Sequence, residues 1–104
     1  MKVSEALEAA RALMNDGGRH WNKHGYFGIN DDGEKTYCSL GALGTIVPDG
    51  QLWIDCKRLL KRHLPDGTNI ANFNDSEDTV WEDVDTLFKR AIAAAEAEEV
   101  ATNG

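Results

Sequence analysis

The chain has 104 residues, of which 41% are hydrophobic and 28% charged, and its formal net charge is −7. These values fit one globular domain of ordinary size, and they exclude a wholly disordered or collagen-like chain. The excess of carboxylates also opposes nonspecific attraction to nucleic-acid phosphates or to an anionic membrane surface.

The first predicted element is a helix over residues 4–16. Ser4 is the expected N-cap, and Gly17-Gly18 can supply the left-handed residue that ends a helix. The apolar side chains recur at helical spacing, which predicts one buried face. They are Val3, Ala6, Leu7, Ala10, Leu13 and Met14.

The pattern changes between residues 19 and 37, where aromatic residues alternate with glycines and turn residues. Short strands around 26–29 and 35–37, joined through Asp32-Gly33, are the simplest interpretation. A short helix over 38–46, rich in small residues, is expected next. It ends before Pro48-Asp49-Gly50.

Two more amphipathic helices are predicted, over residues 52–64 and 79–98. The second has Val80 on its apolar face, and Thr79 with Glu82 forms an expected capping box. We therefore expect a mainly α fold: a single globular domain over 1–99, with three main helices, a short helix, a small β-hairpin and a frayed tail over 100–104. The expected core is Leu7, Leu13, Leu43, Leu59, Leu87, Phe88 and Ile92.

Charge is divided unevenly along the chain. Residues 55–63 carry four cations and one carboxylate, a net +3, whereas residues 75–85 carry six carboxylates and no cation, a net −6. The two segments could attract each other or separate partners. A solvated helix face is the simpler interpretation of the basic cluster. The candidate partner-binding residues are Lys57, Arg58, Lys61 and Arg62.

The expected cellular location follows from the lack of a membrane-spanning run and of a signal-peptide pattern in the sequence. No apolar run approaches the roughly 18–20 residues of a membrane span, and residues 1–5 lack the plan of a signal peptide. We therefore expect a cytoplasmic protein with no membrane partner, in which Cys38 and Cys56 stay reduced. The histidines and cysteines miss the familiar zinc spacings, so neither a metal nor a cofactor is expected.

Cys38 is the one candidate nucleophile. It begins the predicted 38–46 helix, where free backbone N–H groups and the helix dipole favour a thiolate. His20 or His24 could act as base, and Asn74 or Asp75 could orient the imidazole. The opposing interpretation is structural, since cysteine is often buried and Asn-Asp before a helix is typical of turns and caps.

Three motifs together resemble a known group of proteins. Cys38-Ser39-Leu40-Gly41-Ala42-Leu43, the segment Ile70–Asp75, and a helix beginning Thr79-Val80-Trp81 resemble a small uncharacterised family found in actinobacteria and their phages. The resemblance spans nearly the whole chain. After Asp75 the sequence departs from the pattern, because residues 76–79 replace a Pro-Gly-Arg-Thr-like turn. The resemblance implies a bacterial cytoplasm and no established activity.

The sequence favours a non-enzymatic protein-interaction module, such as a phage accessory protein that acts on a host or phage protein. One alternative is a Cys38-dependent hydrolase or transferase acting on a small amide or thioester. A third is a nucleic-acid-associated regulator that binds through residues 57–62, which the net charge opposes. The sequence identifies no particular partner and leaves the oligomeric state open.

Overall fold

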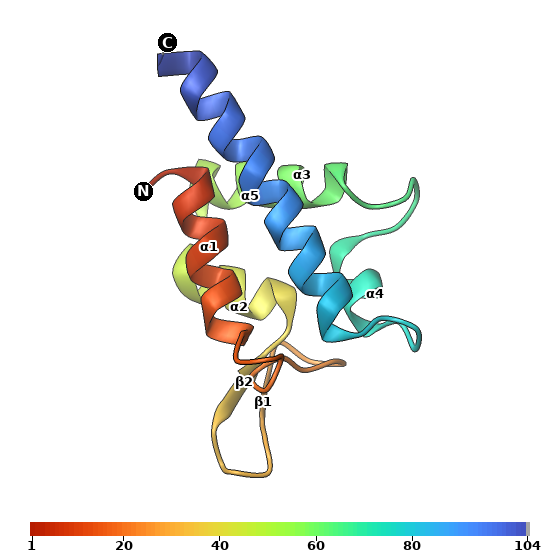
Figure 1. The fold of residues 1–104 in the computed structure, drawn as a ribbon. Coiled ribbons are helices and arrows are strands. Elements are labelled where there is room, and N and C mark those ends of the chain that lie inside the picture. The colour runs from red at the N-terminus through yellow and green to blue at the C-terminus, as the bar shows by residue number, and fades with distance from the viewer. Residues whose placement is uncertain (104) are drawn as a thin grey trace.

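A computed structural model describes residues 1–103, with side chains through residue 101. Within that range the chain forms five helices and a two-stranded sheet (Figure 1). The expected mainly α fold with a small hairpin is therefore confirmed. The helices are α1 (Val3–Met14), α2 (Ser39–Ile46), α3 (Gly50–Arg62), α4 (Ile70–Asp75) and α5 (Trp81–Asn103), and the strands are β1 (Phe27–Ile29) and β2 (Lys35–Tyr37).

The core lies where α1, α2, α3 and α5 meet. Figure 1 shows α1 running beside α5, with α2 and α3 next to them, and side-chain contacts join the two helices from Arg11–Asp85 to Ser4–Glu99. Of the expected core, Leu7, Leu43, Leu59, Leu87 and Phe88 are buried. Leu13 and Ile92 are only partly buried at the edge of the same cluster. Several amphipathic stripes thus share one core, because none of these helices can bury its apolar face alone.

The start of α1 differs from the prediction. The helix begins at Val3, and the Lys2 backbone N–H donates to Glu5 Oε1 at 2.8 Å. Ser4 is therefore inside the first turn and is not the N-cap. Its hydroxyl donates to Glu99 Oε1 at 2.7 Å, which ties the start of α1 to the far part of α5.

The start of α5 also differs. The backbone N–H of Val80, just before the helix, donates to Asp83 Oδ2 at 3.0 Å. Asp83, and not the predicted Glu82, therefore makes this capping contact. Thr79 and Trp81 are buried, whereas Val80 is 52% exposed and does not belong to the apolar face. The helix continues through Asn103, beyond its predicted end at 98. Residue 104 of the predicted frayed tail lies outside the described residues.

The turn after α1 explains the paired glycines. Asp16, Gly17 and Gly18 all have positive φ, at 69°, 69° and 85°. A Cβ on Gly18 would lie 2.5 Å from Trp81 Cγ, so this turn packs directly on the first residue of α5. Gly18 is therefore required both for its backbone conformation and for the close approach.

The hairpin is antiparallel, with Phe27 opposite Tyr37, Gly28 opposite Thr36 and Ile29 opposite Lys35. Figure 1 shows it projecting from the helical body at the end away from α3. The sequence did not predict α4. Its N-cap is Asn69, whose Oδ1 accepts the Asn72 N–H at 2.7 Å.

Candidate functional site

Asn74 is the centre of a buried hydrogen-bond network. The side chain is 1% exposed. Its Oδ1 accepts from Trp21 Nε1 at 2.7 Å, from Ser39 N at 3.0 Å and from Ser39 Oγ at 2.8 Å. Its Nδ2 donates to Asn22 O at 3.0 Å and to Asp75 Oδ1 at 3.0 Å. The amide therefore joins α4 to the start of α2 and to the 19–26 segment.

A close backbone approach reinforces this junction. The Cys38 N–H donates to Tyr26 O at 3.1 Å. A Cβ on Gly41 would lie 2.0 Å from that same Tyr26 oxygen, so only glycine fits at this position of α2. The small-residue motif that begins at Cys38 and the Asn-Asp motif of α4 thus meet in space, and both hold the 19–26 segment against the helices.

Cys38 caps α2 at this junction. Its Sγ accepts the Gly41 N–H at 3.3 Å, and the residue is 7% exposed. Among the described residues, no hydrogen bond joins the sulfur to either candidate imidazole. Cys38 therefore has the helix-terminus position that the sequence predicted, in a nearly closed environment.

The candidate bases have other contacts. His20 Nε2 lies 3.5 Å from Glu34 Oε2. His24 is exposed and has a φ of 64°, and its backbone N–H, rather than its imidazole, donates to Asp75 Oδ1 at 2.8 Å.

Asp75 remains ionised in this setting. Burial alone would raise the pKa of its carboxyl. The hydrogen bonds from His24 N–H and Asn74, together with the electrostatic effect of the nearby His24 and Lys23, outweigh burial and lower that pKa.

The hydrogen bonds of Asn74 and Asp75 therefore stabilise the junction and do not orient an imidazole. Catalysis by Cys38 stays a prediction.

Cys56 is a core thiol: it is fully buried, and burial and the nearby Asp55 carboxylate raise its pKa to about 11. Within residues 1–103, no group of three or more acidic, cysteine or histidine residues could hold a metal ion. The same residues include no helix long and apolar enough to cross a membrane.

Three of the four candidate partner-binding residues line one groove between α3 and α4. Lys57, Arg58 and Lys61 supply its basic side. Leu40, Ile70 and Ala71 supply apolar surface, and the cavity has a volume of about 490 Å³. We name this the α3–α4 groove. The charge cluster signalled its basic side, whereas its apolar side depends on the unpredicted α4.

The cations of the groove have few intramolecular partners. Among the described side chains, neither Lys57 nor Lys61 forms an ion pair, and Arg58 lies 3.9 Å from Asp55. Lys57 Nζ lies 5.1 Å from the centre of the Trp53 ring. No Asp or Glu is among the described residues that line the groove, so the groove keeps a net positive charge.

The fourth candidate, Arg62, lies elsewhere. Its guanidinium bonds Glu98 of α5 at 2.8 Å. The acidic 75–85 segment does not pair with the basic segment either, because Asp85 bonds Arg11 at 2.6 Å and Lys89 at 3.0 Å. The possible attraction between the +3 and −6 segments is thus absent from the ion pairs of residues 1–101.

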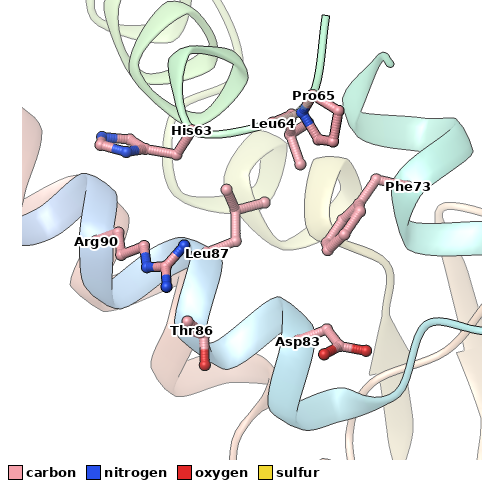
Figure 2. Close-up of a pocket in the computed structure, with 8 residues that line it drawn as sticks. All are labelled: His63, Leu64, Pro65, Phe73, Asp83, Thr86, Leu87 and Arg90. Atoms are coloured by element: carbon pink, nitrogen blue, oxygen red, sulfur yellow. The ribbon is translucent and has the colours of Figure 1, made fainter.

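A second cavity, of about 270 Å³, lies between the end of α3, α4 and α5. Figure 2 shows Arg90 and Asp83 at its two ends, with Leu87 between them and the Phe73 ring directed inward. His63 also lines this cavity, but its Nε2 is buried and has no hydrogen-bond partner. This buried nitrogen is not available to a molecule in the cavity.

The hairpin carries an exposed apolar surface that the sequence prediction did not identify as functional. Tyr26, Phe27 and Ile29 are 65%, 52% and 77% exposed. Lys35 Nζ lies 4.3 Å from the centre of the Phe27 ring and shields part of it. The period-two alternation of Phe27 and Ile29 around Gly28 was the available signal.

Comparison with known protein families gives a match. A family model described as "Family of unknown function (DUF6197)" matches residues 1–94. No curated protein and no solved structure matches the chain.

Proposed function

The chain belongs to the DUF6197 family of unknown function, and we propose that it is a non-enzymatic protein-interaction module. One observation carries the proposal: the α3–α4 groove combines apolar surface with the cations Lys57 and Lys61, which form no ion pair among the described side chains. Following the resemblance described above, we expect a host or phage protein as partner, in a bacterial cytoplasm.

The chemistry of the groove favours an acidic segment with one or two large apolar side chains. Leu40, Ile70 and Ala71 would contact the apolar groups, while Lys57 and Lys61 would face the carboxylates at the rim. Rim charges of this kind act mainly on partner choice and association rate, and the apolar contacts supply much of the affinity.

Two other functions are less well supported. Cys38 bonds Gly41 N–H and neither histidine, so no contact favours the hydrolase or transferase. A nucleic-acid regulator would need residues 57–62 to present one positive surface. Arg62 bonds Glu98 instead, and the net charge of −7 opposes approach of phosphates.

A displayed library of random peptides tests the proposal directly. We expect selection on the chain to enrich peptides in which Asp or Glu flanks a large apolar residue. The double reversal Lys57→Glu/Lys61→Glu should weaken such a peptide about tenfold or more, which corresponds to about 1.4 kcal/mol. NMR shift changes on peptide addition should map to α3 and α4.

The matched control is Lys2→Glu/Arg90→Glu. It makes the same change in net charge at two exposed positions outside the groove, and it should bind the selected peptide like the unaltered chain. The proposal fails if no acidic sequence is enriched, or if both double variants weaken binding equally.

A further inference from the structure

The outer edge of β1 is open. Antiparallel neighbours alternate between pairs that exchange backbone hydrogen bonds and pairs that do not. Asn30 N–H bonds Glu34 O, and Cys38 N–H bonds Tyr26 O, so the intervening pair Gly28 and Thr36 is also of the bonded type. The N–H and C=O groups of Phe27 and Ile29 therefore point away from β2.

The equivalent outer edge of β2 is already occupied at Tyr37. Its N–H donates to His20 O at 2.8 Å, and its C=O accepts from Asn22 N–H at 3.0 Å. On β1, by contrast, the outward groups of Phe27 and Ile29 have no partner among residues 1–103. Unpaired strand edges with apolar side chains are sites at which another chain adds a strand.

We propose that the β1 edge pairs with the β1 edge of a second copy of this chain. A two-fold axis at Gly28 sets Phe27 opposite Ile29 of the second copy, and Ile29 opposite its Phe27. Each of these pairs exchanges two backbone hydrogen bonds through groups that now have no partner. The result is a four-stranded antiparallel sheet, β2-β1-β1-β2.

The side chains suit this register. Phe27 and Ile29 lie on the same face of β1, because side chains two residues apart in a strand share a face. Across the new interface each aromatic ring therefore meets a β-branched side chain, which is a favourable cross-strand pair. A two-fold interface must be complementary to itself, and this pairing of Phe27 with Ile29 satisfies that condition.

Charge also favours antiparallel over parallel pairing of the two β1 edges. In the antiparallel arrangement the tip of one hairpin, with Asp31, lies toward the segment that precedes the other β1, and that segment carries Lys23. The neighbouring Asp32 is already paired with Arg19 of its own chain. The two helical bodies then lie at opposite ends of the joined sheet, because each hairpin projects from its own body (Figure 1).

The association should be weak. Each β1 has three residues, and an interface of this length falls well short of the roughly 1,000 Å² of a stable dimer. Pairing through the hairpin would leave both α3–α4 grooves free, since α3 lies at the other end of the body (Figure 1). A dimer would thus offer two grooves to a partner with two acidic segments.

The test is a concentration series of the whole chain by sedimentation velocity and NMR. We expect a rise in sedimentation coefficient with concentration, slowed hydrogen exchange at the Phe27 and Ile29 amides, and shift changes in residues 26–30. A sample mixed from labelled and unlabelled chains should give an intermolecular contact between the Gly28 α-protons, because that pair does not exchange hydrogen bonds and its Cα atoms approach to about 4.5 Å.

Ile29→Lys places a charge on the edge and should weaken the dimer at least about tenfold. Ile54→Lys is the matched control, because Ile54 is also exposed, at 47%, and lies on α3. It should dimerise like the unaltered chain. A chain that stays monomeric at millimolar concentration overturns the proposal. So does equal weakening by both variants, or self-association that leaves the Phe27 and Ile29 amides unprotected.

Discussion

Replacing Asn74 with Ala tests whether the buried amide network holds the fold together. The change removes five hydrogen bonds. It leaves the N–H and O–H of Ser39 without their acceptor, and Ser39 is fully buried. A buried donor left unsatisfied costs about 1–3 kcal/mol, so these two groups alone give about 2–6 kcal/mol.

We take about 3 kcal/mol, in the lower part of this range, as the expected loss, and count nothing for Trp21, which is only partly buried. That loss is a large part of the roughly 5–15 kcal/mol by which a domain of this kind is stable. Urea unfolding followed by circular dichroism and tryptophan fluorescence gives the free energy of unfolding.

Asn72→Ala is the control. Asn72 is on the same short helix, and its side chain is exposed and makes no hydrogen bond among the described residues. It should change stability by no more than about 0.5 kcal/mol. A loss below about 1 kcal/mol for Asn74→Ala would refute the reasoning. So would equal losses for the two variants.

Two other perturbations probe the packing and the charges. Gly18→Ala should cost at least about 1 kcal/mol more than Gly17→Ala, because both have positive φ but only Gly18 faces Trp81 at 2.5 Å; urea unfolding measures both. Burial alone would raise the pKa of Asp85, but hydrogen bonds and charge from Lys89 and Arg11 hold it below its usual 3.8. Its ion pairs therefore stabilise the fold above about pH 4 and are lost as pH falls through the folded pKa. Asp85→Asn should accordingly destabilise at pH 7 and progressively less below pH 4 in an acid titration, and a loss that does not change with pH would contradict this assignment.

The sequence by itself predicted α1, α2, α3, α5 and the hairpin. The apolar spacing of residues 3–14 and 84–95 has the 3.6-residue period of an amphipathic helix, and it predicted α1 and most of α5 together with Leu7 and Phe88 in the core. The hairpin followed from Asp32-Gly33 between two short extended segments. These features rest on interactions between near neighbours in the chain, which a local pattern records.

Other features depended on contacts between residues far apart in sequence. From the sequence, Asn74 was either a group that orients an imidazole or a turn residue, whereas in the structure its amide bonds Trp21 and Ser39, 53 and 35 residues away. The short α4 escaped prediction because six residues carry too little periodicity, yet it supplies one side of the α3–α4 groove. In the sequence Arg62 is equivalent to Lys61, but in the structure α5 places Glu98 beside Arg62.

The open β1 edge is of the same kind. Sequence predicts that two strands pair, but only the tertiary structure shows that residues 20–22 occupy the edge of β2 and leave that of β1 free. Whether a buried amide, a cation or a strand edge finds a partner depends on which distant segment folds against it. A local sequence pattern does not predict which distant segment this is, because the free energy that decides it comes from packing of the whole chain.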